Sequence, residues 1–496
     1  MHPGEVFRNR ISKYNKKKNS FEKISRRLSW SRLIIFLAGL AAIYISTFFN
    51  FTVLISIIII FIAVFLRIVY LHNKALNQMK KAERMETINQ LEINALNHDF
   101  SSFSHGGKYQ TPEHDFSFDL NIFGKDSVFQ LFNRTVTDNG EQKLADWFSQ
   151  PLLNADDIKK RQEAIRELSH HINHMQWFMQ TGQIRRFTKD QTHNLNVWTS
   201  KKDHAVKKER WLAGSFSLAS LILLGLTIAG VIFWPWLIFW IIAGLSITGA
   251  YNKKVNEHHA GLNHIAPSLE TMKQLISIIT DLDFNSEILK TAQNKLSSSQ
   301  DHSSLKKLIN ILQAFDVRHN IFAAFILNSL FLWDLHQIAR LSNWKKKHGT
   351  GLKEKSESVF TFDALISLAN FAYCYPEYIY PQIEKPSGSK FLLEGTNCKH
   401  ILIPKHERAG NPVSMSEKGS FSIITGANMA GKSTYLRTIG LNIILAQLGV
   451  PVNCQTFKFT PVRIISSLST KDSLVKNESF FYAELKRLQY IIQTLE

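Results

Sequence analysis

Cysteine is scarce in this sequence, which has only Cys374, Cys398 and Cys454 among its 496 residues. The three are scattered, with no Cys-x-x-Cys pair and no Cys/His cluster, so the sequence predicts neither a disulfide framework nor a zinc site. Thiols left unpaired suit a reducing compartment, and we therefore expect the regions of the chain outside any membrane to be cytoplasmic. The sequence also lacks a repeat period and any low-complexity tract.

Acidic residues are outnumbered by basic ones. The chain has 59 Lys and Arg against 40 Asp and Glu, a formal net charge of +19 and a pI of about 9.6. This balance predicts attraction to an anionic partner, either phospholipid or nucleic acid, and composition does not choose between them. The plain alternative is that the excess charge is solvated surface.

Charge is missing altogether from two long apolar blocks, at residues 33–66 and 211–251. One membrane span needs about 20 apolar residues, with about 17 as a lower limit, so each block can hold two spans and a tight turn. We expect the first turn near Asn50. We expect the second at 234–236, a Trp-Pro-Trp sequence, because proline cannot continue a helix and tryptophan suits the membrane interface. A pair of buried core helices is the alternative, but it does not explain blocks of this length without a polar face.

Basic residues flank both blocks. If each block is a hairpin, all flanks lie on one side, which the positive-inside rule assigns to the cytoplasm. The sequence therefore predicts a multi-pass membrane protein with a cytoplasmic N-terminus. The first block is too long for a cleaved signal peptide and lacks its small-residue site. The flanking residues are Arg8, Arg10, Lys13, Lys16, Lys17, Lys18, Lys23, Arg26, Arg27, Arg32, Arg67, Lys74, Lys80, Lys81, Lys201, Lys202, Lys207, Lys208, Arg210, Lys253 and Lys254.

Helical periodicity covers most of the remaining chain. The predicted elements are, in order, a polar helix leaving the membrane at 72–98, a helical segment over 117–175 broken at Gly140 and Pro151, long helices over 255–345, a charged loop or helix end at 343–358, a helix at 362–375, short strands over about 380–424, and alternating strand and helix after that.

One motif carries definite chemistry. The stretch GANMAGKS, from Gly426 to Ser433, fits the phosphate-binding pattern G-x-x-x-x-G-K-[ST]. Glycines let successive backbone N–H groups point at phosphate oxygens, and the following helix presents its positive N-terminal end. Lys432 then reaches the β- and γ-phosphates, and the Ser433 hydroxyl ligates Mg²⁺. A β-type run at 421–424 and an amphipathic helix ending at Gly449 supply the strand–loop–helix setting; a chance glycine turn is the alternative.

This loop resembles that of the MutS family of mismatch-repair ATPases. The family loop reads T-G-P-N-M-x-G-K-S-T-Y-x-R, and this chain has TGANMAGKSTYLR, with Ala427 where proline is usual. Residues 124–168 resemble the start of the family's helical core, 362–372 the helix that leads out of it, and 469–488 the family's signature segment. The resemblance implies ATP and Mg²⁺ as cofactors. The nucleotide-binding residues that it implies are Gly426, Ala427, Asn428, Met429, Ala430, Gly431, Lys432, Ser433 and Thr434, with Ser433 on the Mg²⁺.

In the family, the signature segment faces the nucleotide of a second subunit, so the resemblance also implies a homodimer formed through the nucleotide domains. Ser479 holds the position whose hydroxyl would approach the partner's γ-phosphate, although Asn477 and Glu478 replace the usual Gly and Arg. A solvated surface serine is the alternative. The resemblance covers roughly 124–200 and 255–496. The other matching positions in the signature segment are Asp472, Leu474, Phe481 and Glu484.

Three features of the family pattern have no counterpart in the sequence. Residues 1–120 contain no mismatch-reading domain with its Phe-x-Glu motif, and the second apolar block stands where a DNA clamp interrupts the family's helical core. Residues 434–496 contain no apolar run ending in Asp-Glu. We therefore expect membrane anchors in place of DNA-gripping insertions, and a truncated chain that binds nucleotide but hydrolyses it poorly. No catalytic residue is assigned.

The predicted fold is multidomain, with two transmembrane helical hairpins, an all-α MutS-like core and a C-terminal α/β P-loop NTPase domain of ABC-like type. The predicted domains are a basic cytoplasmic tail (1–32), the first hairpin (33–70), a linker helix and loop (71–120), the N-terminal half of the helical core (121–210), the second hairpin (211–251), the C-terminal half of the helical core (252–378) and the incomplete ATPase domain (379–496).

The function predicted first is a membrane-anchored, MutS-related protein that binds DNA in an ATP-dependent way, with membrane lipid as a second partner. The missing reading domain argues against mismatch specificity. One alternative is an ABC-like transport-associated ATPase. Two observations argue against it: the apolar blocks contain no charge that would mark a transport pathway, and the chain has no LSGGQ sequence. The other is a membrane scaffold or sensor that binds nucleotide without a role on DNA.

Overall fold

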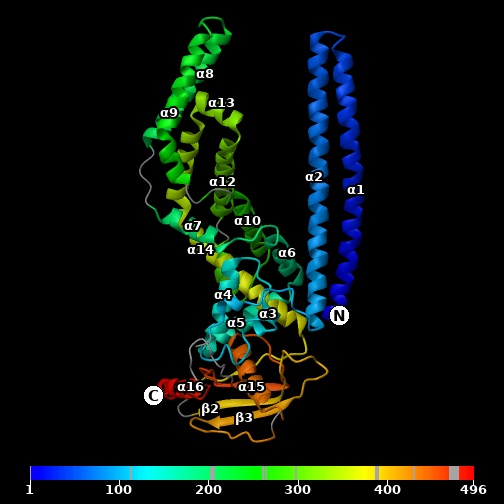
Figure 1. Cartoon of the computed structure of the whole chain (residues 1–496), viewed down its shortest axis with the longest axis vertical. Coiled ribbons are helices and arrows are strands. Elements are labelled where there is room, and N and C mark those ends of the chain that lie inside the picture. Colours follow the sequence, from blue (N-terminus) through cyan, green and yellow to red (C-terminus); the bar gives the residue numbers. More distant parts are fainter. Residues whose placement is uncertain are drawn as a thin grey trace.

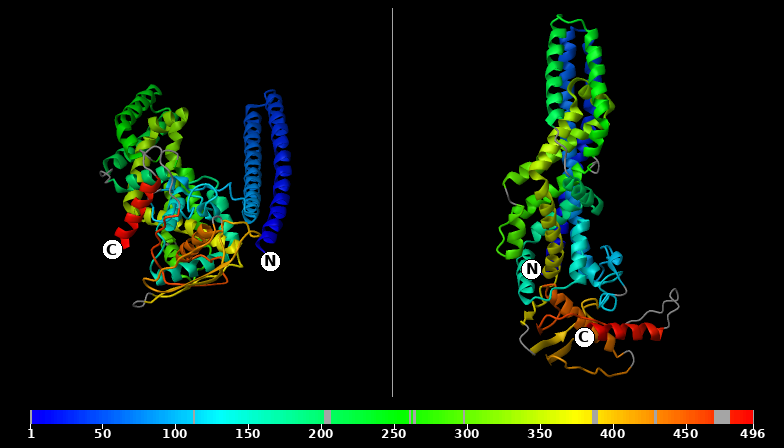
Figure 2. Two further views of the ribbon diagram at one scale, coloured as in Figure 1. Left: turned by 60° about the horizontal axis from the view of Figure 1, so that its bottom comes forward. Right: turned by 90° about the vertical axis from the view of Figure 1, so that its left-hand side faces the viewer.

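The computed structural model describes residues 2–111, 114–201, 207–259, 262, 265–296, 299–385, 390–427, 430–468 and 480–495. The molecule is elongated, with a helical core in its middle (Figure 1). Two long helical hairpins extend from the core in the same direction, and a small sheet lies at the opposite end (Figures 1 and 2). The fold is mostly helical, as predicted, with one small mixed sheet.

The first hairpin is an antiparallel pair of very long helices, α1 (Pro3–Ser46) and α2 (Phe51–Leu96). The turn between them lies at 47–50, and Asn50 has the extended backbone of an N-cap residue, with φ −62° and ψ 147°. The turn predicted near Asn50 is confirmed. The polar helix predicted over 72–98 is the second half of α2, so apolar and polar segments form one continuous rod.

The basic N-terminal segment belongs to this rod and differs from the separate tail predicted over 1–32. It forms the first turns of α1 because the polar half of α2 lies beside it. Lys18 Nζ lies 2.6 Å from one carboxylate oxygen of Glu86, and Asn15 donates to the other at 2.7 Å. These bonds hold the pKa of Glu86 below its usual value.

The second hairpin consists of α8 (Lys207–Ile228) and α9 (Pro235–His259). Pro235 is the first residue of α9, where its missing N–H removes no helical hydrogen bond, so the predicted turn is confirmed. Trp240 of α9 stacks on Phe216 of α8, with ring centroids 4.6 Å apart. These rings hold the two helices of the hairpin together.

Three of the described helices are long and apolar enough to cross a membrane, by length and composition: α1, α2 and α8. α9 is not among them. A fourth crossing would require α13 (Ile321–Phe331) and α14 (Trp333–Cys374), which are bent by 82°, to count as one span. Membrane crossing itself stays a prediction.

The core is assembled from helices on both sides of the second hairpin in the sequence. Besides segments of α2 and α14, it contains α3 (Val128–Phe132), α4 (Asp138–Ser149), α5 (Ala155–Ser169), α6 (Ile172–Gly182), α7 (Lys189–Ser200), α10 (Ala266–Thr280), α11 (Glu287–Asn294) and α12 (Ser299–Asp316), with 3-10 turns at Gly107–Tyr109 and Val317–His319. Pro151 separates α4 from α5 as predicted, but Gly140 lies inside α4 and does not interrupt it. Glycine is required there because a Cβ would lie 2.2 Å from Asp363 Oδ2.

Helix α14 runs without a break for 42 residues. The prediction of a charged loop or helix end over 343–358, followed by a separate helix over 362–375, is therefore wrong. The helix continues because one face stays anchored through the charged stretch. Trp344 donates its indole N–H to the carbonyl oxygen of Ser304 at 2.6 Å, and Leu352 is buried two turns later.

The sheet consists of β1 (Gln382–Ile383), β2 (Lys390–Cys398), β3 (Asn411–Glu417) and β4 (Thr456–Phe459), in the order β1-β4-β2-β3. Strand β2 pairs antiparallel with β3 and β4, and β1 pairs parallel with β4. Helix α15 (Lys432–Gln447) precedes β4, and α16 (Phe480–Leu495) follows it. The predicted alternation of strand and helix after residue 424 is confirmed.

The C-terminal end of α15 docks closely on the core. Gly449, just beyond the helix, has a left-handed backbone with φ +80°. A Cβ there would lie 3.2 Å from Arg161 Cβ and 3.2 Å from the backbone nitrogen of Gln162 in α5. We expect Gly449→Ala to destabilise the protein by about 2 kcal/mol, because a left-handed backbone costs an L-residue about 1–2 kcal/mol before the close contact is added.

The matched control for thermal unfolding is Gly351→Ala in α14. Its Cβ would be 3.8 Å from the flexible end of Lys355, and alanine favours a helix more than glycine does. We expect this change to be neutral or slightly stabilising. Equal shifts in the two unfolding temperatures would contradict the docking role of Gly449.

Candidate nucleotide-binding site

The predicted phosphate-binding loop lies at the N-terminal end of α15. Gly431 caps the helix with a left-handed backbone (φ +88°, ψ 12°). Lys432 bends back over the loop, and its ammonium donates to the carbonyl oxygens of Gly426 at 2.6 Å and Ala427 at 2.7 Å. The charge of Lys432 and the positive end of α15 therefore coincide at this loop, which is the arrangement that binds phosphate.

The residues around Lys432 fit a nucleotide phosphate and its Mg²⁺. Ser433 and Thr434 lie in the first turn of α15 with their side chains at least partly open to solvent, so the Ser433 hydroxyl is accessible to a metal bound there. Apart from its immediate chain neighbours and the backbone of its own helix, no heavy atom of the described residues lies within 4 Å of a Cβ built on Gly431. Ala430 is also exposed. Three of the predicted ligands, Asn428, Met429 and Ser479, lie outside the described residues.

The strand predicted at 421–424 is not formed. Residues 421–427 have no regular secondary structure, and Phe421 and Ile423 are 84% and 79% exposed. A strand requires a hydrogen-bonded neighbour, and none of the four strands in the described regions of the chain pairs with this segment. The loop–helix half of the predicted setting is confirmed, and the strand half is wrong for this structure.

Helix α15 is held on several sides, which fixes the position of the loop. Tyr435 donates its hydroxyl to the carbonyl oxygen of Pro412 in β3 at 2.8 Å. Gln447, at the other end of the helix, donates to the carbonyl oxygen of Val462 at 2.8 Å. The central residues of α15 are buried: Leu441, Asn442, Ile443, Ile444, Leu445 and Ala446.

Residues 114–124, here called the connector, join the site to the helical core. Arg437 of α15 donates to the carbonyl oxygen of Asp119 at 2.9 Å. A Cβ on Gly440, one turn later, would lie 3.0 Å from the side chain of Leu120. The connector therefore lies directly against the helix that carries the loop, and it continues into α3 of the core.

The connector also contacts helix α16 and the segment that follows β4. Asp115 accepts from Arg463 at 2.8 Å and from the Tyr490 hydroxyl at 2.7 Å. Burial raises the pKa of Asp115, but these two donors outweigh it and leave the pKa below its usual value. Arg487 of α16 donates to the carbonyl oxygen of His114 at 3.0 Å. The carboxylate of Asp115 thus joins three chain segments while ionised.

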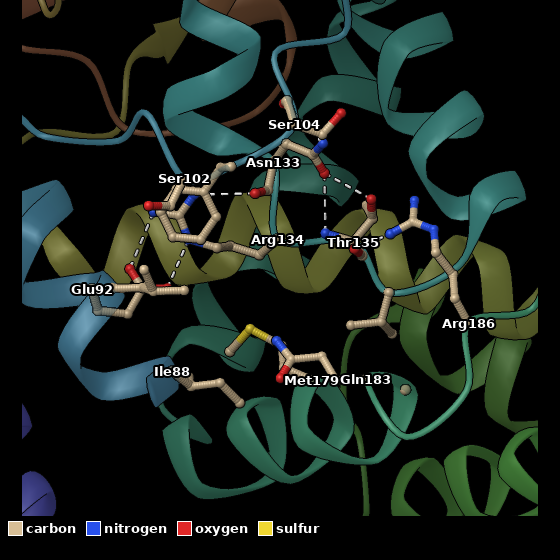
Figure 3. A pocket seen from close by; sticks show the side chains of 14 residues that line it. Ile88, Glu92, Ser102, Ser104, Asn133, Arg134, Thr135, Met179, Gln183 and Arg186 are labelled. Carbon is tan, nitrogen blue, oxygen red and sulfur yellow. Dashed lines mark hydrogen bonds and ion pairs between the residues drawn. The ribbon is translucent and has the colours of Figure 1, made fainter. Parts of the chain in front are cut away.

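A buried ion pair fastens α2, a helix of the first hairpin, to the core. Arg134 Nε donates to Glu92 Oε1 at 2.7 Å and Arg134 Nη2 to Oε2 at 3.2 Å, and Glu92 is 1% exposed. Figure 3 shows this pair at one end of a cavity of about 350 Å³, with Arg186 at the other end. Arg186 is itself paired with Asp138 and Glu141 at 2.5 Å, so both guanidinium groups have carboxylate partners. We therefore assign this cavity a structural role.

A second joint connects the end of α2 with the sheet end of the molecule. Arg408, in the loop between β2 and β3, donates to the Tyr378 hydroxyl at 2.6 Å and lies 3.3 Å from His98 Nε2. His98 follows α2 with a left-handed backbone, φ 68°. Burial, supported by Arg437 and Arg408, lowers the pKa of the nearby His400 to about 4. This histidine is therefore neutral at ordinary pH.

Sequence reasoning finds the loop but misses these joints. It assigns residues 114–120 of the connector to a linker and predicts a helical segment from 117, whereas no helix forms between residue 117 and α3. It singles out neither Glu92 nor Arg134. The signal for the connector is weak, since Asp115 and Asp119 are ordinary acidic residues in a loop. A charged residue within an amphipathic helix, such as Glu92, gives no sign of burial.

Two family models match the chain. The one described as MutS domain III matches residues 86–369, more than half of the chain, and the one described as MutS domain V matches residues 422–496. The first match begins inside α2 and encloses α8 and α9. The second contains the predicted phosphate-binding loop, α15 and α16.

Individual relatives agree with these matches. The chain is 34% identical to "MutS protein homolog 4" of Homo sapiens over 143 residues, which are 28% of this chain and 15% of that protein. It is 33% identical to "DNA mismatch repair protein MutS" of Thermotoga maritima over 151 residues, 30% of this chain and 18% of that protein. It is 31% identical to "DNA mismatch repair protein Msh6" of Gallus gallus over 155 residues, 28% and 11% of the two chains.

The matched segments cover less than a fifth of each of these three relatives. The domain III match, however, spans the helical core from α2 to α14, and the domain V match spans the loop that the sequence motif identified. The chain belongs to the MutS family.

Proposed function

We propose that this protein is a membrane-anchored member of the MutS family that binds ATP with Mg²⁺ and binds DNA in an ATP-dependent way. The observation that carries the proposal is the loop at the start of α15, where the Lys432 ammonium and the helix N-terminus meet. Lys432 and the backbone N–H groups hold the phosphates, and the Ser433 hydroxyl holds Mg²⁺. Asn428, Met429 and Thr434 complete the loop by family resemblance.

The membrane anchoring in this proposal rests on the two hairpins. Both extend from the core in the same direction, so one bilayer can hold both (Figures 1 and 2). α1, α2 and α8 expose large apolar side chains to their surroundings, including Ile59, Ile60 and Leu218. Water-exposed helices of soluble proteins do not present such a surface, whereas lipid-facing helices do. The N-terminus of α1 and the sheet then lie on the cytoplasmic side.

DNA is proposed as the partner because the relatives of the matched segments are named for DNA mismatch repair. The net charge of +19 is compatible with a polyanion. Dimerisation through the nucleotide domains belongs to the same proposal, with Ser479 approaching the nucleotide of the partner. Phe421 and Ile423, exposed beside the loop, offer an apolar surface to the second copy.

A second candidate is a membrane scaffold or sensor that binds nucleotide and has no role on DNA. The location of the basic residues favours it: Arg26, Arg27 and Arg32 lie on α1 just before its apolar segment. At that height they would face phospholipid headgroups, and lipid would account for the excess charge without DNA.

DNA binding by the detergent-solubilised protein separates the two candidates. Matched, mismatched and branched duplexes are compared at physiological salt with and without ATP, because low salt would report charge alone. Lys432→Ala serves as the nucleotide-blind control. We expect ATP to strengthen binding to at least one DNA structure in the wild type and not in Lys432→Ala. Weak binding that ignores ATP and disappears with salt would reject the DNA role in favour of the scaffold.

A further inference from the structure

The side chains of helix α13 are arranged in the reverse of the way expected for a surface helix in water. Its two polar side chains, Asn328 and Ser329, are buried against the rest of the protein. Four of its large apolar side chains point outward, namely Ile321, Phe322, Phe325 and Ile326, and the first two are 81% and 83% exposed. A surface helix in water places its apolar face inward, so this orientation requires an apolar environment outside.

The apolar stretch around α13 is too short to cross a membrane. Residues 320–333 carry no charge, whereas a span needs about 20 apolar residues. The chain also turns by 82° between α13 and α14 and leaves in another direction. An apolar segment that enters a bilayer and turns back inside it has these properties.

The contacts of α13 with α9 give its height along the second hairpin. Before α13, Arg318 donates to Asn252 at 3.3 Å. Asn252 is the residue at which the uncharged stretch of α9 gives way to lysines. Near the end of α13, the carbonyl oxygen of Ser329 lies 2.1 Å from where a Cβ on Gly244 would be, so glycine allows the two backbones to meet. The eight residues from Asn252 to Gly244 correspond to about 12 Å along α9.

The bend after α13 lies against the other helix of the hairpin. Ser217 of α8 donates its hydroxyl to the carbonyl oxygen of Phe331 at 3.0 Å, which satisfies a backbone acceptor at the bend. Leu332 and Leu335 pack on Ala213 and Phe216 of α8. Figure 1 shows α13 beside α8 and α9 and above α12. A broken helix at membrane depth is tolerated where its backbone groups are satisfied by protein in this way.

We infer that α13 is a re-entrant membrane element, which enters the cytoplasmic leaflet beside the second hairpin and presents Ile321, Phe322, Phe325 and Ile326 to lipid chains. The inference rests on the proposed membrane anchoring. Lipid is the occupant because the outward face of α13 is continuous with the exposed apolar surface of α8 and α9. A depth of about 12 Å stays within one leaflet, since half of the hydrocarbon core is about 15 Å.

Site-directed fluorescence in liposomes tests this placement. Phe325→Cys carries an environment-sensitive fluorophore, and the protein is reconstituted in phosphatidylcholine and phosphatidylglycerol vesicles. Ile242→Cys on α9 is the membrane reference, and Leu153→Cys, on the exposed surface of the core, is the water reference. The three natural cysteines are buried, and the chain without an added cysteine gives the background label.

We expect nitroxide groups on lipid chains to quench the fluorophore of Phe325→Cys about as strongly as that of Ile242→Cys. The fluorophore of Leu153→Cys should be quenched by aqueous iodide instead. If Ile242→Cys is quenched by iodide and not by lipid, the membrane anchoring fails. If Ile242→Cys is quenched by lipid but Phe325→Cys by iodide, the anchoring stands and the re-entrant assignment is overturned. A Phe325 label shielded from both quenchers also overturns it, because a second copy or another protein would then cover α13.

Depth along α13 gives a second readout. Labels at Ile321 and Ile326 are compared with nitroxides placed near the headgroup and near the chain end. Because α13 climbs from Asn252 towards Gly244, we expect Ile326→Cys to favour the deeper quencher and Ile321→Cys the shallower one. Equal preferences would mean that α13 lies flat at the surface, contrary to entry into the leaflet.

Discussion

Replacing Lys432 with alanine should remove most of the affinity of this protein for ATP while leaving its fold intact. The ammonium of Lys432 lies within hydrogen-bonding distance of the carbonyl oxygens of Gly426 and Ala427, so it is already held over the loop. A hydrogen bond to a charged group contributes about 1.5–3 kcal/mol, and Lys432 is expected to bind two phosphate groups. The loss of about 3 kcal/mol corresponds to roughly a hundredfold weaker binding.

The measurement is equilibrium binding of ATP with Mg²⁺ to the detergent-solubilised protein. Lys458→Ala is the matched control, because Lys458 is an exposed lysine of β4 in the same region of the molecule. Thermal unfolding of both variants separates a binding defect from misfolding. If Lys432→Ala binds ATP as the wild type does, the loop at the start of α15 is not the nucleotide site.

The features of the fold that depend on local sequence were predictable. The turn at Asn50, the start of α9 at Pro235 and the end of α15 before Gly449 each rest on a residue whose backbone preference acts at that position. The loop was predictable for the same reason, because its glycines and Lys432 are contiguous in sequence. A motif confined to eight neighbouring residues can be located without knowledge of the tertiary structure, and its chemistry stays a prediction.

The secondary-structure predictions were wrong where contacts with distant segments of the chain determine the structure. The charged stretch 343–358 has the lysines and two glycines of a loop or helix end, but the buried Trp344 anchors it to α12 and keeps it helical. The run at 421–424 has the composition of a strand, but strand formation depends on a neighbour that the run itself does not encode. Helix α13 gives little signal in the sequence because it is shorter than a membrane span. The property that sets it apart, the exposure of its apolar side chains, depends on the tertiary structure.

The joints of the candidate site could not be predicted for the same reason. Arg437 and Asp119, which connect α15 with the connector, are 318 residues apart in sequence. Glu92 and Arg134 are 42 residues apart, and their side chains look like ordinary surface charges until the fold buries them. Together these contacts form a continuous route from the loop through the connector to the core and on to α2.

The first hairpin is connected to this route through α2, whose first half is apolar and exposed and whose second half packs in the core. The domain III match begins at residue 86, within α2, so the family core and the apolar segment share one rigid rod. A displacement of the core at Glu92 would therefore be transmitted along the hairpin. The Glu92–Arg134 ion pair is one contact between the hairpin and the core, beside the hydrogen bonds of Arg10 and Asn89 with Gln176 of α6.

We expect Arg134→Met to destabilise the protein by about 3–5 kcal/mol, because it leaves the buried Glu92 carboxylate without its partner. Methionine can keep some of the packing that Arg134 makes on the Phe103 ring, whose centroid lies 3.4 Å from the guanidinium carbon. The matched control is Lys18→Met, which breaks the more exposed Lys18–Glu86 pair on the same hairpin and should cost about 1 kcal/mol or less. Thermal unfolding of the solubilised protein measures both.

The double variant Glu92→Gln, Arg134→Met identifies the cause. If the cost of Arg134→Met comes from an unpaired buried charge, removing that charge should restore some of the lost stability, so the double variant should unfold at a higher temperature than Arg134→Met. If the double variant is less stable than Arg134→Met, the loss comes from the packing of Arg134 and not from its charge. If Arg134→Met costs no more than Lys18→Met, the ion pair does not fasten α2 to the core, and other contacts hold the hairpin, among them the hydrogen bonds of Arg10 and Asn89 with Gln176 of α6.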